Sequence, residues 1–428
     1  MLASRVSYLA RASRLVKHSR LLSTIANVKE QKSLVTEVHK KDSMLHVHWN
    51  DQSVSRFPYI YLRDICNCPK CLDAKSFQRK LDIVGQIDLN IQAKSVEVTQ
   101  DGQKVQISWP DNHVSEFDSR WLHQNKLKER GDVVDETKGI ARESVTLWDR
   151  KQMQDKLPRF IFEDVLRKDE VLYNWLFTLH EFGITLLVDA PTNSDPIAAL
   201  VLAQRVGYNK ATHYGFKFDV HAKFDANNLA YTTEYLPLHC DIPTAKNYPG
   251  VQILHCLEQV PTKGGSNQFV DGFKIAQDFK NKEPELYDVL SKTPIPYVDI
   301  GADVFGDFHL KNTWPVIELD HNKKIRRFTY NNHVRDYHLT SPPEKVCDIY
   351  RGYMLLGQMM RDPENKIDQK LQKGEMVTFN NSRVLHGRSE FTPTRAGNRH
   401  LQGTYLDWDL IYARLRSLGQ SLGRPFNE

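Results

Sequence analysis

Three potential metal ligands that lie far apart in the chain constrain its fold more than any other feature. His239 and Asp241 form an H-x-D pair before the apolar segment 251–257, and His386 follows a second apolar segment, 376–379. In an extended segment, side chains two residues apart point to the same side, so His239 and Asp241 can share one ion. A third ligand from a distant strand would complete the facial triad of non-haem iron(II) oxygenases, which leaves three coordination positions open.

An arginine after the second histidine strengthens this interpretation. On a strand following His386, Arg399 can grip the distal carboxylate of 2-oxoglutarate through paired hydrogen bonds. An H-x-D pair alone occurs by chance in many sequences, and either histidine alone could be an ordinary core or surface residue. The complete ordered set is hard to attribute to chance. We therefore predict that His239, Asp241 and His386 bind iron and that Arg399 binds the co-substrate. His255, inside an apolar strand, is predicted to be a hydrogen-bonded core histidine.

A cysteine cluster predicts a second metal site. Cys66, Cys68 and Cys71 lie within six residues, and His113 follows in a turn after a predicted strand. Thiolates this close repel one another unless a soft cation neutralises them, and Zn²⁺ prefers four such ligands. A closed site of this kind is structural and stabilises a small domain; the alternative is that the thiols are idle or form a redox pair. The three isolated cysteines are predicted to be ordinary buried thiols: Cys240, Cys256 and Cys347.

Hydrophobic patterning divides the rest of the chain into two blocks. Residues 30–125 contain short alternating segments bounded by Asn, Asp and Gly, which predict a small antiparallel β domain. Residues 126–160 are polar and irregular and are expected to connect it to a domain over 161–428, where strands and helices mix. The fold class is mainly β with flanking helices, a barrel or sandwich. Predicted strands are 44–49, 59–62, 96–98, 105–109, 184–188, 251–257 and 376–379, with Trp121 in a further short one; predicted helices are 162–182, 275–290, 343–360 and 409–422.

The first 29 residues differ in composition from the rest. They carry six Lys or Arg, no Asp or Glu, and five serines, which is typical of a mitochondrial transit peptide; a basic tail that binds an acidic partner is the alternative. We expect the mitochondrial matrix, with the cytoplasm as the second possibility. The remaining 52 basic and 53 acidic residues give no charge-driven attraction to nucleic acid or a membrane surface. No segment approaches the ~20 apolar residues that a membrane-spanning helix needs.

Several sequence runs resemble the gamma-butyrobetaine dioxygenase family of taurine-dioxygenase-like 2-oxoglutarate oxygenases. They are Tyr61-Leu62-Arg63-Asp64, Trp109-Pro110-Asp111, the run Asp-Ala-Asn-Asn-Leu-Ala-Tyr-Thr-Thr at 225–233, Val270-Asp271-Gly272-Phe273, Asn331-Asn332 and Asp407-Trp408-Asp409. The resemblance implies a double-stranded β-helix (jelly-roll) catalytic domain, an N-terminal zinc domain and a homodimer. It also implies hydroxylation of gamma-butyrobetaine to L-carnitine, the last step of carnitine biosynthesis, with Fe(II), Zn(II), 2-oxoglutarate, O₂ and ascorbate.

The same resemblance assigns substrate-binding residues. The residues at the family's cage positions, which would surround a trimethylammonium group, are Tyr214, Phe218, Tyr231 and Tyr405. Those at the positions that bind the substrate carboxylate are Asn228 and Asn332. Aromatic faces suit a quaternary ammonium because it has no N–H to donate, and amides can donate to a carboxylate without adding charge. Phe218 stands where the family usually has tryptophan, which weakens the cation–π surface. Cys240 and Ile242 also depart from the usual residues beside the H-x-D pair.

Three other functions remain open at this point. The first is trimethyllysine hydroxylase, a sister enzyme that pairs the α-amine of its substrate with an acidic residue at the position where this chain has Asn228. The transit-like composition of the first 29 residues favours this enzyme, whereas Asn228 argues against it. A neutral amide would leave that ammonium group unpaired. A non-catalytic zinc-containing binding protein is disfavoured by the complete H-x-D, His and Arg set. A hydrolytic zinc enzyme is disfavoured by Arg399 and by the lack of an evident general base.

Overall fold

The computed structural model describes residues 33–76, 78–99, 101–127, 145–221, 233–392, 399–424 and 426. These residues form two compact units, one in the part of the chain up to residue 135 and one from residue 136 onward. The predicted transit peptide, 1–29, lies outside the described residues. Within the described ranges, no helix is both long and apolar enough to cross a bilayer.

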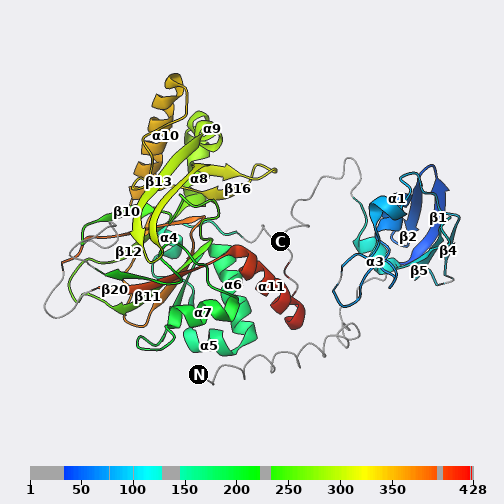
Figure 1. The fold of residues 1–428 in the computed structure, drawn as a ribbon, viewed down its shortest axis with the longest axis horizontal. Coiled ribbons are helices and arrows are strands. Elements are labelled where there is room, and N and C mark those ends of the chain that lie inside the picture. The colour runs from blue at the N-terminus through cyan, green and yellow to red at the C-terminus, as the bar shows by residue number, and fades with distance from the viewer. Residues whose placement is uncertain are drawn as a thin grey trace. The chain divides into compact units, whose positions relative to one another are not determined.

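The N-terminal unit contains two three-stranded antiparallel sheets, with strand orders β1-β2-β3 and β4-β5-β6 (Figure 1). Alternate residues of the central strands, such as Leu45 and Val47 or Val105 and Ile107, are fully buried. Their core also contains Trp49, Phe57, Trp109 and Phe117. The strands are β1 (Val35–Lys41), β2 (Met44–Trp49), β3 (Val54–Pro58), β4 (Ser95–Val98), β5 (Lys104–Ser108) and β6 (Val114–Asp118).

Each of these sheets leads directly into a short helix. α1 (Tyr59–Asp64) follows β3, and α3 (Ser119–Gln124) follows β6, where the Asp118 carboxylate accepts a hydrogen bond from the backbone N–H of Trp121 at 3.1 Å. The sequence interpretation placed 59–62 and Trp121 in strands, and both assignments were wrong. In segments this short, the spacing of the apolar residues fits both the two-residue repeat of a strand and the 3.6-residue repeat of a helix. The remaining helix is α2 (Ile83–Gln86).

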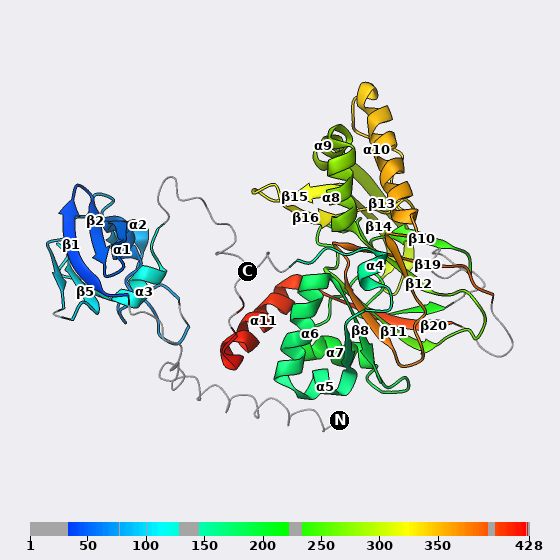
Figure 2. The same ribbon diagram turned by 180° about the vertical axis from the view of Figure 1, so that it is seen from behind.

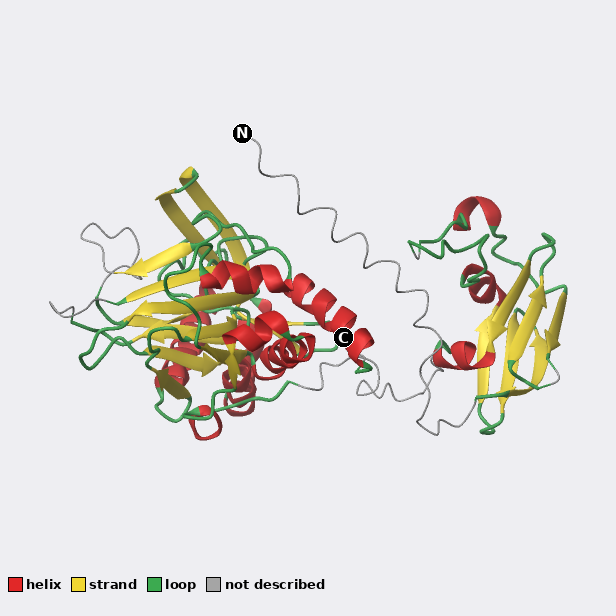
Figure 3. Cartoon of the chain, turned by 90° about the horizontal axis from the view of Figure 1, so that it is seen from below, coloured by secondary structure: helices red, strands yellow, loops and turns green. Residues whose placement is uncertain are grey.

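The larger unit is built on a four-stranded sheet, β10-β19-β12-β17, and a six-stranded sheet, β7-β8-β18-β11-β20-β9. Its fold is mainly β with flanking helices, as predicted (Figure 3). Only β7 and β8 pair in parallel among the described strands of these sheets. The sheet strands are β7 (Arg159–Ile161), β8 (Ile184–Val188), β9 (Phe218–His221), β10 (Leu236–His239), β11 (Val251–Glu258), β12 (Asn267–Asp271), β17 (Lys366–Gln369), β18 (Met376–Asn380), β19 (Val384–Arg388) and β20 (His400–Leu406). Two further hairpins are β13 (Pro294–Asp303) with β14 (Gly306–Pro315), and β15 (Ile317–Leu319) with β16 (Ile325–Phe328).

Alternation along the strands divides the core of this unit into layers. On β11, Val251 and Ile253 pack against helices, whereas Leu254 and Cys256 share a buried cluster with Phe269 of the four-stranded sheet. The two sheets therefore face each other. Figures 1 and 2 show α5, α6, α7 and α11 gathered together beside the six-stranded sheet, and α8, α9 and α10 gathered elsewhere. The helices are α4 (Arg150–Met153), α5 (Phe162–Arg167), α6 (Asp169–Phe182), α7 (Ala198–Val206), α8 (Gly272–Lys282), α9 (Pro284–Lys292), α10 (Pro343–Arg361) and α11 (Trp408–Leu422).

The sequence boundaries differ from the structure in three places. The helix predicted over 162–182 is two helices that meet at Lys168, and the one over 275–290 is divided before Pro284, because proline cannot continue a helix from within. Residues 145–160, expected to connect the two domains, belong to the larger unit. There the fully buried Trp148 donates from its indole N–H to the carbonyl of Phe182 at 2.7 Å.

A candidate iron centre, its cavity and a candidate zinc centre

The three predicted iron ligands converge at one edge of the four-stranded sheet. β10 and β19 are antiparallel neighbours, and His239 lies directly opposite His386 in their register. The Nε2 atoms of His239 and His386 lie 3.3 and 3.6 Å from the same carboxylate oxygen of Asp241. One ligand atom from each residue fits within a 4.8 Å span. Two imidazoles and one carboxylate on one side of a metal position form the donor set of a facial triad.

Hydrogen bonds hold these ligands in place. The ring Nδ1 of His239 contacts the carbonyl oxygen of Pro237 at 2.8 Å; when Nδ1 carries the proton, Nε2 is free to bind a metal. Asn381 receives a hydrogen bond from the backbone N–H of Asp241 at 2.8 Å and returns one to its carbonyl at 3.0 Å. The Tyr405 hydroxyl donates to the second carboxylate oxygen of Asp241 at 2.7 Å. The sequence did not reveal Asn381, because no motif marks a side chain that is hydrogen-bonded to the backbone of a distant residue.

The charge states at this centre suit a divalent cation. Burial would raise the pKa of Asp241, but His386, His239 and the hydrogen bond from Tyr405 outweigh it and hold that pKa well below its usual range. Burial, together with the neighbouring His239, lowers the pKa of His386 to about 3. At neutral pH the site therefore presents a carboxylate and a neutral imidazole, which are the forms that bind metal ions.

A cavity of about 280 Å³ opens beside the triad. Arg399 and Arg388 are buried in its wall, where Arg399 donates from Nε to the Gly265 carbonyl and from Nη2 to the side-chain oxygen of Asn267, both at 3.0 Å. Burial and the neighbouring Arg388 lower the pKa of Arg399 to about 9, and burial lowers that of Arg388 to about 10. Two buried cations of like charge are costly unless an anion lies beside them. This wall therefore fits a carboxylate ligand.

Aromatic rings line another part of the same cavity. The rings of Phe218 and Tyr405 are stacked with centroids 5.0 Å apart, and Tyr214 follows Phe218 at 6.3 Å. The tip of the Phe218 ring lies over Gly403, where an added Cβ would clash with the Cζ atom of the ring. Gly403 thus makes room for the ring on strand β20. Tyr231 and Asn228, the other predicted residues of this region, lie outside the described residues.

The structure places one predicted substrate-binding amide, that of Asn332, outside the triad cavity. Asn332 is exposed and its side-chain oxygen accepts a hydrogen bond from Arg335 Nε at 3.1 Å, away from the triad cavity. Its neighbour Asn331 is buried on the cavity wall, with its amide nitrogen donating to the carbonyl of Cys240 at 2.9 Å. Both residues lie at a bend after β16, where the Asn331 side-chain oxygen accepts hydrogen bonds from the backbone N–H groups of His333 and Val334. Sequence alone did not tell which of the two faces inward.

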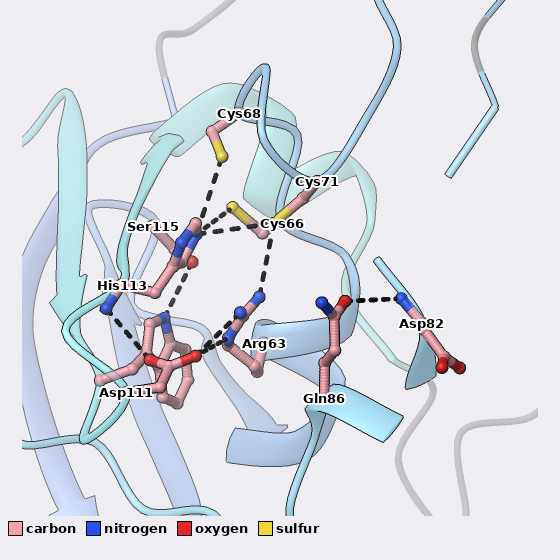
Figure 4. A network of polar contacts seen from close by, with 10 residues as sticks. Arg63, Cys66, Cys68, Cys71, Asp82, Gln86, Asp111, His113 and Ser115 are labelled. Atoms are coloured by element: carbon pink, nitrogen blue, oxygen red, sulfur yellow. Dashed lines mark hydrogen bonds and ion pairs between the residues drawn. The ribbon is translucent and has the colours of Figure 1, made fainter. Parts of the chain in front are cut away.

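The predicted zinc ligands converge in the N-terminal unit (Figure 4). Nε2 of His113 lies 3.3, 3.7 and 3.6 Å from the sulfur atoms of Cys66, Cys68 and Cys71. A tetrahedral zinc ion with Zn–S bonds of about 2.3 Å and Zn–N bonds of about 2.0 Å holds sulfur and nitrogen about 3.5 Å apart. The four side chains therefore match the size of a zinc tetrahedron. Because all four corners are supplied by protein, this site is closed, unlike the triad.

An ion pair between the buried Arg63 and the exposed Asp111 supports the zinc ligands. Arg63 pairs with Asp111 at 3.0 Å and contacts the Cys71 sulfur at 3.4 Å, and Asp111 accepts a hydrogen bond from the backbone N–H of His113 at 3.1 Å (Figure 4). Burial raises the pKa of Cys71 to about 11 despite the Arg63 contact, with Cys66 adding to the effect. A bound cation would relieve this crowding of sulfur atoms.

Two side predictions were wrong. Cys240 and Cys256 are buried as expected, but Cys347 is exposed on α10. His255 is fully buried on β11, and its ring faces the backbone near Ala190 without a hydrogen bond of good geometry to either nitrogen among the described residues. Burial lowers the pKa of His255 to about 4, so it is neutral at pH 7.

Comparisons with known proteins agree on one family. The sequence profile described as "Taurine catabolism dioxygenase TauD, TfdA family" matches residues 149–405, and "Gamma-butyrobetaine hydroxylase-like, N-terminal" matches residues 36–123. The gamma-butyrobetaine dioxygenases of Pongo abelii and Homo sapiens are 37% identical over 377 residues, which cover 88% of this chain and 95% of each relative. The mitochondrial trimethyllysine dioxygenase of Rattus norvegicus is 31% identical over 390 residues, covering 91% and 88%.

Proposed function

We propose that this chain hydroxylates gamma-butyrobetaine to L-carnitine. It belongs to the gamma-butyrobetaine dioxygenase branch of the TauD, TfdA family and is thus a 2-oxoglutarate-dependent dioxygenase. The observation that carries the proposal is one cavity lined by the metal triad, two buried arginines and a row of aromatic rings. The identity to gamma-butyrobetaine dioxygenases, which extends across both units, supports it. We interpret the two facing sheets as the double-stranded β-helix of this family.

In this proposal the triad and the arginines bind the metal and the co-substrate. His239, Asp241 and His386 hold Fe(II), and Arg399, supported by Arg388, binds a carboxylate of 2-oxoglutarate by charge and hydrogen bonds. When both are bound, they would supply, with O₂, the oxidising chemistry that converts a C–H bond into C–OH: one oxygen atom enters the hydroxyl group, the other enters succinate, and 2-oxoglutarate loses CO₂. The protein's own residues contribute position: Asn381 and Tyr405 orient Asp241 through hydrogen bonds before any ligand enters.

The aromatic rings and an amide orient the substrate. Tyr214, Phe218 and Tyr405 would surround the trimethylammonium group, with Tyr231 as a fourth ring from outside the described residues. Asn331, in place of Asn332, would donate its second amide hydrogen to the substrate carboxylate, with Asn228 as its partner. Because Tyr405 contacts both Phe218 and Asp241, the cage adjoins the metal position. Fixing both ends of the substrate selects which carbon lies near the metal.

Several further assignments belong to the same proposal. Cys66, Cys68, Cys71 and His113 would hold a structural Zn²⁺, which their spacing supports. We also propose a homodimer, ascorbate as the reductant that maintains Fe(II), and the mitochondrial matrix as the location, the last on the composition of residues 1–29. Import of a fluorescent protein fused to residues 1–29 tests the location, and cytoplasmic fluorescence would argue for the alternative.

A substrate assay tests the function. The purified protein is incubated with Fe(II), ascorbate and 2-oxoglutarate, and gamma-butyrobetaine or trimethyllysine is added separately. We expect stoichiometric succinate and a product heavier by one oxygen atom with gamma-butyrobetaine. Preferential oxidation of trimethyllysine would move this chain to the sister activity, which is the second candidate because of the 31% identity. Oxidation of neither would refute both.

A further inference from the structure

One acidic side chain in the cavity has no role in the proposal so far. Asp299 belongs to β13, whose first half is buried at Ile295 and Tyr297 and whose end projects with Ile300 exposed. The carboxylate of Asp299 lies between these halves, lines the triad cavity and is 26% exposed. Apart from Asp241, it is the one acidic residue on this wall among the described residues.

No cation neutralises Asp299 within the described part of the chain. Among the residues that the structure describes, the one possible ion-pair partner in range is His213, whose Nε2 lies 3.9 Å from a carboxylate oxygen, too far for a hydrogen bond. Burial lowers the pKa of His213 despite the neighbouring acids Asp299 and Asp303, so its ring is neutral at pH 7. Burial also raises the pKa of Asp299 from its usual value. A carboxylate in this setting gains from any cation that enters the cavity.

Asp299 stands at the outer end of the aromatic row. The His213 ring beside it lies 3.9 Å from Tyr214 and 4.5 Å from Phe308 between centroids. Tyr214 is followed by Phe218 and Tyr405, as described above. The two arginines line the same cavity from the end of β19 and from the residue before β20, where Arg399 is hydrogen-bonded to Gly265 and Asn267. The cavity therefore has a cationic region and a separate region of aromatic rings with one acid.

We infer that Asp299 is a specificity-determining residue that makes the aromatic subsite select a cationic substrate end over an uncharged group of the same shape. This inference rests on the proposed function, which supplies a trimethylammonium substrate. A quaternary ammonium donates no hydrogen bond, so a carboxylate can act on it through charge alone. Asp241, the other acid, is committed to the metal. Phe218 offers a weaker cation–π surface than tryptophan, and the charge of Asp299 compensates for it.

The test compares three variants with the unchanged protein. Asp299→Asn removes the charge at equal size, Asp299→Glu keeps it, and Asp307→Asn removes an exposed charge from the same hairpin, on β14. Binding of tetramethylammonium is measured by NMR titration. Turnover is measured with gamma-butyrobetaine and with 5,5-dimethylhexanoate, in which carbon replaces the quaternary nitrogen. Unchanged thermal unfolding and unchanged 2-oxoglutarate binding show that each variant is folded.

We expect Asp299→Asn to weaken tetramethylammonium binding at least tenfold. It should lower kcat/KM for gamma-butyrobetaine by a similar factor while leaving that for 5,5-dimethylhexanoate within threefold. Asp299→Glu and Asp307→Asn should retain the preference for the cation. Equal tetramethylammonium affinity in Asp299→Asn and the unchanged protein would overturn the inference. If tetramethylammonium binding depends on Asp299 but gamma-butyrobetaine is not oxidised, the inference stands and the proposed function fails.

Discussion

The two candidate metal centres differ in how the chain assembles them. Three zinc ligands come from one loop of six residues, and the fourth comes from a turn in the same unit. The triad takes its ligands from β10, β19 and the residues just after β10, which the sheet brings together from distant parts of the chain. A closed site made of local ligands holds a small unit together. An open site made by a sheet can exist before the metal binds and keeps positions for reactants.

The largest expected effect is on turnover, and it comes from removing the carboxylate of the triad. Asp241→Ala should reduce turnover at least ~10³-fold, because the triad loses its only anionic ligand. The zinc content and the unfolding of the N-terminal unit should not change. Turnover by succinate release and metal content by mass spectrometry measure the two halves of this expectation. Substantial remaining turnover would show that Asp241 is not a ligand.

Loss of a candidate zinc ligand should instead affect the folding of the N-terminal unit. Cys71→Ser, or zinc removal by a chelator, should unfold the N-terminal unit, because structural zinc supplies folding free energy of several kcal/mol or more in small domains. Amide hydrogen exchange should show lost protection over 33–127, while the larger unit keeps its protection. Cys347→Ser is the matched control, since Cys347 is exposed and isolated from both centres. Full protection after zinc removal would mean that the local core is sufficient.

A third prediction concerns acid stability of the larger unit. The folded pKa of His255, about 4, lies below its ordinary value of 6.5. The unfolded chain therefore binds more protons, and stability falls as the pH is lowered from about 6.5 to about 4, by roughly 3 kcal/mol at most. Urea unfolding of the larger unit across this range measures the effect.

Variants measure the share of His255 in this pH dependence. His255→Leu should make the dependence less steep without abolishing it, because the lowered pKa of His386, about 3, acts in the same direction. His309→Leu, at an exposed position on β14, should leave it intact. An equally steep loss in His255→Leu would place the titrating group elsewhere. The N-terminal unit should keep the same pH dependence in both variants, because His255 belongs to the larger unit.

The smallest effect tests how rigidly the sheet holds the triad. Tyr405→Phe keeps the ring beside Phe218 but removes the hydrogen bond to Asp241. Since one hydrogen bond to a charged group contributes about 1.5–3 kcal/mol, we expect the apparent Fe(II) affinity to fall about tenfold, with little change in KM for the substrate. A changed substrate KM with unchanged Fe(II) affinity would assign Tyr405 to the cage alone.

The sequence contained enough information for the ligand sets but not for their supports. His239, Asp241 and His386, like the three cysteines and His113, were recognisable because few residue types bind metals and their spacing is restricted. Arg63, Asn381 and Asp299 were not recognised as part of either centre, because their roles depend on partners that lie far away in sequence. Asn332 was chosen over Asn331 for the same reason: Asn331 faces the cavity because its amide donates to the carbonyl of Cys240, which is distant in sequence.

Donor chemistry, apolar periodicity and family resemblance, all properties of the linear sequence, determined the candidate metal ligands, the mainly β architecture and the dioxygenase class. Tertiary structure alone decided that 59–62 form a helix, that Asn331 faces the cavity, and that Asp299, which has no cationic partner among the residues described, lies beside the aromatic rings. These features depend on which distant strands become neighbours and on which charged side chains are desolvated by burial. The partners that a buried side chain meets are a property of the assembled core, so no local pattern encodes them.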